Sequence, residues 1–261
     1  MVQQTNPYKK YLDDLFDRII ELRHTSSNIN STLKASLERF ANYQGNFLSG
    51  SALVISDWSG QTDNGWEINF HTGFRKITLK ENYENEIQRI VSQECCYAFA
   101  QSFEALEKFF KDCIFEKGLP SKKCFFGLIE KNSKNIKRES LNGLRLYKMV
   151  KIIGDPYFSK YSEINNKSLK FKELWTILSE CRHAITHSKS IITVKKIKKS
   201  EYHFKVFNFL FMHSKNADGT LTIELDLKKL SDVLDIVSEF AFQVYKSISL
   251  KENLDWEIVK K

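Results

Sequence analysis

The chain has 261 residues, of which 42% are hydrophobic and 28% charged, and it contains only ten glycines and three prolines. This composition excludes an intrinsically disordered protein and disfavours a turn-rich β-sandwich, so long helices are expected. The net charge of +8 suggests an anionic partner, with nucleic acid first and a membrane surface second, although a soluble protein can also be basic without such a partner.

Residues 1–82 are predicted to form an N-terminal part whose role the sequence does not indicate. Apolar residues recur at helical spacing over residues 8–43, which predicts a helix. Residues 46–80 contain short β-prone runs, and the turn signals Asn64-Gly65 and Thr72-Gly73 separate them, so a small β-meander is expected.

Residues 83–261 are predicted to form a helical bundle with small β-ribbon additions, which makes the chain mainly α within the α+β class. The longest predicted helix covers residues 84–117 and ends before Gly118 and Pro120. A polar loop is expected over 121–139. Further helices are predicted over 141–153, 169–188 and 227–249, and strands over 191–197, 202–211 and 220–225.

Five cysteines without a C-x-x-C pair predict free thiols in a reducing cytoplasm. The N-terminus lacks the apolar core of a signal peptide, and no stretch approaches the ~20 apolar residues of a membrane span. We therefore expect a cytoplasmic protein without a membrane partner.

The most informative segment places Arg182, His183 and His187 near the end of a predicted helix. At 100° per residue, the apolar stripe of this helix centres near Leu178. Arg182 falls at the edge of the stripe, whereas His183 and His187 are i,i+4 neighbours on the opposite side. The imidazoles are thus expected to face solvent or a second subunit.

Arg182, followed by the polar His183 and then His187, resembles the R-x4-6-H signature of the HEPN superfamily (higher eukaryotes and prokaryotes nucleotide-binding). The preceding long helix carries an F-E-x-L-E-x-F-F pattern from Phe103 to Phe110, and the resemblance covers roughly residues 84–250. It implies a bundle that dimerises through its motif helices. Many members are metal-independent endoribonucleases that act as toxins or in antiviral defence, whereas others are non-catalytic binding modules.

One HEPN subgroup carries a tyrosine two residues after the motif histidine, which a partner nucleotidyltransferase modifies. This chain has Lys189 at that position, so it departs from the antitoxin pairing of that subgroup. An antitoxin or another defence-system partner remains open.

The residue types suit RNA cleavage without a metal or another cofactor. Imidazole serves as base for the 2′-hydroxyl or as acid for the leaving 5′-oxygen, and guanidinium stabilises the negative phosphorane. Because Arg182 and His187 are about 140° apart on one ideal helix, two chains are expected to share a site. Arg182 would bind the phosphate, His187 would be the acid or base, and His183 would support them. The alternative is a dimeric module that binds RNA or a protein without cleavage.

The lysines after the motif are predicted to contact the RNA backbone, because phosphate neutralisation dominates non-specific affinity. The alternative for the run from 195 to 199 is a solvated hairpin end that blunts a sheet edge. An aromatic stretch follows at strand alternation, and core or dimer packing is expected for it. The lysines are Lys189, Lys195, Lys196, Lys198 and Lys199, and the aromatic residues are Tyr202, Phe204, Phe207, Phe209 and Phe211.

A metal site is a competing interpretation of the two histidines. His183-x3-His187 is a metal-ligand spacing, and Glu180-x-x-His183 matches half of a di-iron motif. However, Ala184 stands where a zinc protease needs glutamate, no second Glu-x-x-His is present, and Arg182 would repel a cation. We therefore predict no metal.

Overall fold

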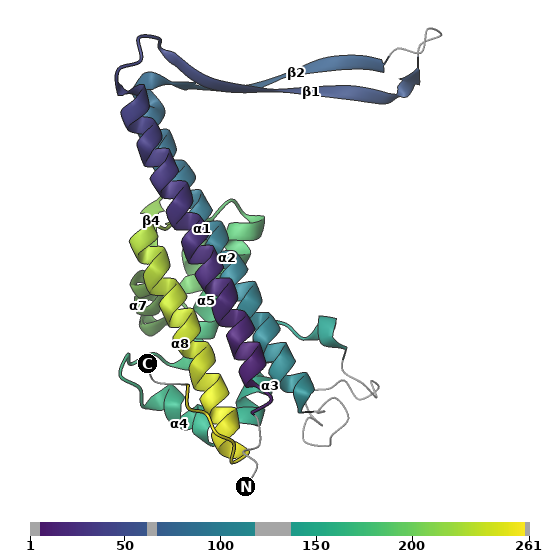
Figure 1. The fold of residues 1–261 in the computed structure, drawn as a ribbon, viewed down its shortest axis with the longest axis vertical. Helices are drawn as coiled ribbons and strands as arrows, with labels where there is room; N and C mark the ends of the chain where they lie inside the picture. Colours follow the sequence, from purple (N-terminus) through teal and green to yellow (C-terminus); the bar gives the residue numbers. More distant parts are fainter. Residues whose placement is uncertain (1–5, 62–66, 118–136, 259–261) are drawn as a thin grey trace. The chain divides into compact units, whose positions relative to one another are not determined.

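The computed structural model describes residues 6–61, 67–117 and 137–258, with the backbone alone for residues 58–61 and 67–68 (Figure 1). In these ranges the chain is mainly helical, as predicted. The α-helices are α1 (Lys9–Ala41), α2 (Tyr83–Glu116), α3 (Gly143–Gly154), α4 (Tyr157–Glu163), α5 (Phe171–His187), α6 (Val194–Ile197), α7 (Glu201–Leu210) and α8 (Leu227–Lys251). The strands are β1 (Phe47–Gln61), β2 (Glu67–Leu79), β3 (Ile191–Ile192), β4 (Met212–Lys215) and β5 (Leu221–Glu224).

The chain divides into two compact units, and α1 and α2 each contribute to both. The larger unit comprises residues 1–27 and 92–261, and the smaller unit is Asn28–Val91. This division differs from the boundary that the sequence predicts between residues 82 and 83. The reason is that the first half of α1 packs into the bundle, where Leu12, Leu15 and Ile19 are buried.

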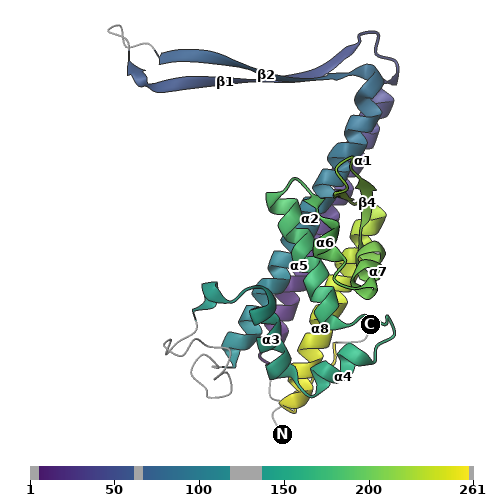
Figure 2. The same cartoon turned by 180° about the vertical axis from the view of Figure 1, so that it is seen from behind.

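The larger unit is a helical bundle in which α1, α2, α5 and α8 run side by side (Figures 1 and 2). Aromatic rings join the helices in its core. Trp175 of α5 stacks on Phe110 of α2 with ring centroids 5.1 Å apart, and Phe110 also meets Phe240 of α8 edge-on at 5.5 Å. Phe171 of α5 lies 5.0 Å from Phe240, so three helices share one aromatic cluster that fixes the position of α5.

A small antiparallel sheet lies against the bundle, with the strand order β3-β5-β4. Ile191 pairs with Thr222, and Ile192 pairs with Leu221. Because β3 follows α5 after three residues, this sheet anchors the chain directly behind the motif helix.

The smaller unit contains the antiparallel hairpin of β1 and β2. Between the pairs Ala52–Arg75 and Val54–His71, β1 has one residue and β2 has three, so β2 bulges there. Gly73 lies in this bulge with a φ of +78°, a backbone conformation that favours glycine. The sequence predicts a turn at Thr72-Gly73 within a meander, and the structure corrects this to a bulge within one long strand.

The region after the motif helix is also corrected. The segments 191–197 and 202–211 are predicted as strands, but Ile191–Ile192 alone is extended, and α6 and α7 follow. In α7 the side chain of Ser200 accepts a hydrogen bond from the backbone N–H of His203 and caps the helix. Val206, Phe207 and Leu210 are buried, and the burial of the adjacent Val206 and Phe207 fits one face of a helix but not the alternation of a strand.

Some sequence predictions lie outside the described residues, namely the turn at Asn64-Gly65, Cys124 and most of the polar loop at 121–139. The helices predicted over 8–43, 84–117, 141–153, 169–188 and 227–249 are confirmed within a few residues, and α4 is an additional helix. Among the helices of the described ranges, none has both the length and the hydropathy of a bilayer-spanning segment.

Candidate functional site

Helix α5 presents the motif residues as the helical pattern predicts. Its buried face includes Leu178, Cys181 and Ile185, while His183 and His187 are exposed. The two imidazole rings have centroids 4.8 Å apart. The helix end therefore carries a pair of adjacent imidazoles that any molecule docking on this face would meet.

Arg182 lies at the edge of the buried face, and α2 holds its side chain. Nη2 donates a hydrogen bond to Oε1 of Glu104 at 3.1 Å, and 28% of the Arg182 side chain is exposed. Nε is buried and has no hydrogen-bond partner within the described part of the chain. A buried unsatisfied donor typically costs about 1–3 kcal/mol, and an external acceptor can reach Nε only if the Arg182 side chain moves.

Glu107 lies one helical turn after Glu104 on α2 and also faces the positive charge of Arg182. Burial raises the pKa of the Glu107 carboxyl, Glu104 raises it as well, and the charges of Lys111 and Arg182 partly oppose this rise. In the sequence, Glu104 and Glu107 are recognisable only as letters of the F-E-x-L-E-x-F-F pattern. Their role beside Arg182 requires the packing of α2 against α5.

The turn after α5 holds Lys189 and Ser190 in left-handed backbone conformations, with φ of +50° and +64°. The N–H groups of Ser188 and Ser190 both donate to the carbonyl of Ala184, and the Ser190 carbonyl accepts from the N–H of Ile223 in β5. These bonds fix the exposed Lys189 two residues after His187.

The other predicted RNA-binding lysines lie on and after the short helix α6, so the predicted hairpin end is corrected to a helix. Ile197 is buried and anchors α6, whereas Lys195 and Lys196 are exposed and have no acidic partner within the described ranges. Lys198 pairs with Glu201 at 3.1 Å, and Lys199 pairs with Glu180 of α5 at 3.3 Å. The Lys199–Glu180 pair connects this basic segment to the motif helix.

A groove of about 560 Å³ lies between α1 and α2, and Glu104 is part of its wall. Its lining combines apolar side chains with charged ones, among them Asp14, Arg18 and Lys108. The groove therefore adjoins the Arg182–Glu104 pair.

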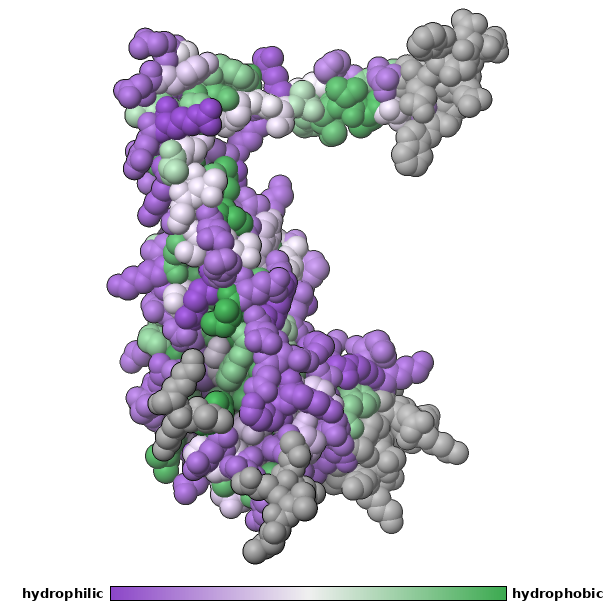
Figure 3. All heavy atoms as spheres, viewed as in Figure 1, coloured by the Kyte–Doolittle hydropathy of each residue, from purple (hydrophilic) through white to green (hydrophobic). Residues whose placement is uncertain are grey.

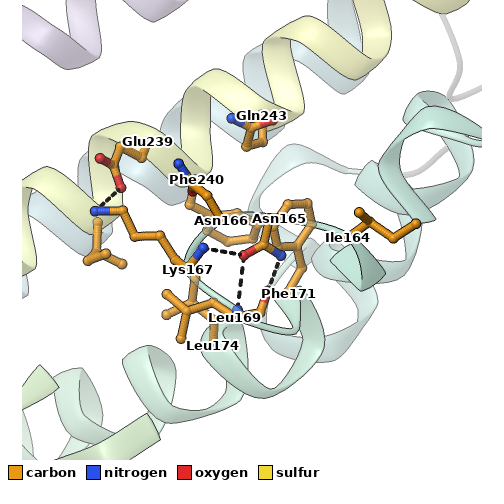
Figure 4. A pocket seen from close by; sticks show the side chains of 11 residues that line it. Ile164, Asn165, Asn166, Lys167, Leu169, Phe171, Leu174, Glu239, Phe240 and Gln243 are labelled. Carbon is orange, nitrogen blue, oxygen red and sulfur yellow. Dashed lines mark hydrogen bonds and ion pairs between the residues drawn. The ribbon is translucent and has the colours of Figure 1, made fainter. Parts of the chain in front are cut away.

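A second cavity of about 330 Å³ lies between α8 and the loop before α5 (Figure 4). The side chain of Asn165 organises this loop by accepting from the N–H of Leu169 and donating to its carbonyl, and Lys167 pairs with Glu239 of α8 at 3.0 Å. Phe171 and Leu174 line the cavity from the first turn of α5. The motif lies at the other end of α5, roughly 18 Å further along the helix from Phe171 to His183.

The predicted aromatic stretch divides between core and surface. Phe207 and Phe211 are buried one helical turn apart, as the packing interpretation expects, but 51% of Phe209 is exposed. The predicted strand alternation is wrong here, since these rings lie on and after α7.

The described residues contain no group of three or more His, Cys, Asp or Glu side chains arranged to hold a metal ion. The metal interpretation thus rests on the spacing of His183 and His187 alone.

Comparison of the chain with protein-family models, with curated proteins and with solved structures finds no match. The HEPN resemblance therefore depends on the motif residues and on the helices around them.

Proposed function

We propose that this protein is a metal-independent endoribonuclease of the HEPN type, which acts as a toxin or antiviral defence effector in the cytoplasm. It cleaves RNA to 2′,3′-cyclic phosphate and 5′-hydroxyl ends. The observation that supports this most is the exposed imidazole pair, with centroids 4.8 Å apart, on the same helix end as the partly exposed guanidinium of Arg182.

In the proposed reaction, neutral His187 of one protomer takes the proton of the 2′-hydroxyl, and the 2′-oxygen attacks the phosphorus. The bond to the 5′-oxygen breaks, and a protonated imidazole of the other protomer gives its proton to this leaving group. Arg182 donates to the phosphate oxygens as negative charge grows, and His183 supports the neighbouring His187. A homodimer supplies both imidazoles and the arginine.

The charge distribution favours RNA as the substrate. Six of the 40 lysines and arginines and seven of the 32 acidic residues lie within Asn28–Val91, so the rest of the chain carries a net charge of +9. Lys189, Lys195 and Lys196 are exposed near or after the end of the motif helix, where they can neutralise phosphates.

The test is cleavage of total RNA by the full chain in EDTA, compared with the His187→Ala variant. We expect EDTA-resistant cleavage by the wild type and a loss of about 100-fold or more in the variant, the usual contribution of an acid or base. His213→Ala, which removes an exposed histidine of β4, is the matched control and should cleave like the wild type. Equal cleavage by His187→Ala, or cleavage that EDTA abolishes, contradicts the proposal.

The second candidate is a non-catalytic dimeric module that binds RNA or a protein. The observation that favours it is that Glu104 already engages Arg182, so the guanidinium has a structural role in the free chain. Retained RNA binding without cleavage by either wild type or variant supports this candidate.

A further inference from the structure

The smaller unit exposes apolar side chains that nothing in its own unit covers. Among the residues of Asn28–Val91 whose side chains the structure describes, Ile87 alone is buried. The hairpin surface shows hydrophobic residues in green in Figure 3. Large apolar residues that are 38–76% exposed include Tyr43, Phe47, Leu53, Val54, Ile55, Phe70, Phe74, Ile77 and Leu79. An isolated two-stranded hairpin is marginally stable at best, so further strands would stabilise this one.

The two edges of the hairpin differ in their protection against strand pairing. Over its 15 residues, β1 has one charged residue, Asp57, and neither lysine nor proline. In contrast, β2 carries Glu67, Arg75 and Lys76, and it bulges at Gly73 in the middle of the hairpin. The extra residues of β1, at 48 and at 58–60, lie outside Ser49–Asp57. Charges and bulges are the usual devices that prevent edge pairing, so the β2 edge is protected and the β1 edge is open between Ser49 and Asp57.

The charge of the smaller unit indicates what kind of partner fits. Its net charge is −1, from six basic and seven acidic residues, so a polyanion finds no attraction there. A neutral strand can pair with its own copy without repulsion. If the two-fold axis passes between Leu53 and Val54, the Asp57 residues of the two copies are roughly 23 Å apart along the strands, well beyond a Debye length.

We propose that β1 is a dimerisation strand, which pairs antiparallel with β1 of a second copy of this chain. The product is a continuous four-stranded sheet in the order β2-β1-β1-β2. Three or more strands give a sheet the independent stability that the lone hairpin lacks. This contact goes beyond the proposed function, which requires dimer contacts only at α5.

The test compares Ile55→Lys with Phe70→Lys in the full chain. Ile55 and Phe70 are directly paired across the hairpin and are 51% and 50% exposed, so both variants place a lysine on the same rung and the same face. Only Ile55→Lys puts the charge on the strand that forms the new pairing. Sedimentation over a concentration series measures association, and amide hydrogen exchange measures protection of β1, β2 and α5 separately.

We expect the wild type to gain protection in β1 as concentration rises. Ile55→Lys should weaken association at least about tenfold and abolish that gain, while Phe70→Lys should retain both. Equal loss in the two variants would indicate a contact through the hairpin face and would overturn edge pairing. Absence of concentration-dependent protection in wild-type β1 would overturn it as well. Protection at α5 is measured separately, so a failure of the α5 contact is distinguishable from a failure of this proposal.

Discussion

Glu107 is the acidic side chain whose titration reports on Arg182. Its folded-state pKa is raised, mainly by burial, so the folded chain holds this proton more tightly than the unfolded chain does. The resulting stabilisation is therefore present below the unfolded pKa of about 4.3 and is lost as the pH rises through the folded pKa. We expect Glu107→Gln to remove this pH dependence, as measured by urea unfolding between pH 4 and 7.

Arg182→Met provides the matched comparison for Glu107. Because the charge of Arg182 lowers the Glu107 pKa, its removal should move the fall in stability to higher pH. If the free energy of unfolding has the same slope against pH in the wild type and in Glu107→Gln, burial does not raise the Glu107 pKa in the folded chain.

The motif residues also show the limit of sequence reasoning for single side chains. The positions of Arg182, His183 and His187 around α5 follow from helical periodicity alone, because the buried face of one helix is a local pattern. The partner of Arg182 does not follow from it. Glu104 is 78 residues earlier in the chain, and only the aromatic packing of α2 against α5 brings the two together.

Among the secondary-structure elements, the turn after α5 carries backbone strain that a substitution can release. Lys189 has a φ of +50°, which costs roughly 1–2 kcal/mol for a residue with a Cβ. Lys189→Gly and Lys189→Gln both remove the charge, but only glycine relieves the strain. We expect the glycine variant to be about 1 kcal/mol more stable than the glutamine variant in chemical unfolding.

The same two variants test the predicted RNA contact of Lys189. Both should lower RNA affinity equally and reduce the slope of log affinity against log salt by about 0.7 for single-stranded RNA. Unequal affinities at matched salt, or an unchanged slope, would show that Lys189 does not contact phosphate.

Helix α7 shows why the sequence predicts the wrong type for some elements. The aromatic residues between 202 and 211 have high strand propensity and nearly alternate, which favours a strand in isolation. The Ser200 cap and the burial of Val206 and Leu210 against the bundle stabilise a helix instead. Tertiary packing outweighs intrinsic propensity here, whereas the long helices α2 and α8 have apolar stripes strong enough to be predicted directly.

At the scale of the whole molecule, the chain separates its charge between its two units. The bundle unit carries the motif and a net charge of +9, while the hairpin unit is nearly neutral. The sequence assigns the basic excess to the whole chain, because charge counts alone do not reveal which residues share a unit. The sequence also predicts that the first 82 residues form one part, because the change from strand-like to helical periodicity falls at the end of β2. The structure assigns the buried residues of α1 to the bundle unit instead.

The most direct test of the central claim mixes two inactive full-length variants, Arg182→Ala and His187→Ala, and measures RNA cleavage in EDTA. If Arg182 of one protomer works with His187 of the other, a mixed dimer joins one intact Arg182 to one intact His187 and lacks only the second His187 imidazole. Equal mixing with free exchange makes half of the dimers mixed, so the mixture should cleave RNA measurably faster than either variant alone. A mixture as inactive as its two components would contradict a shared ribonuclease site.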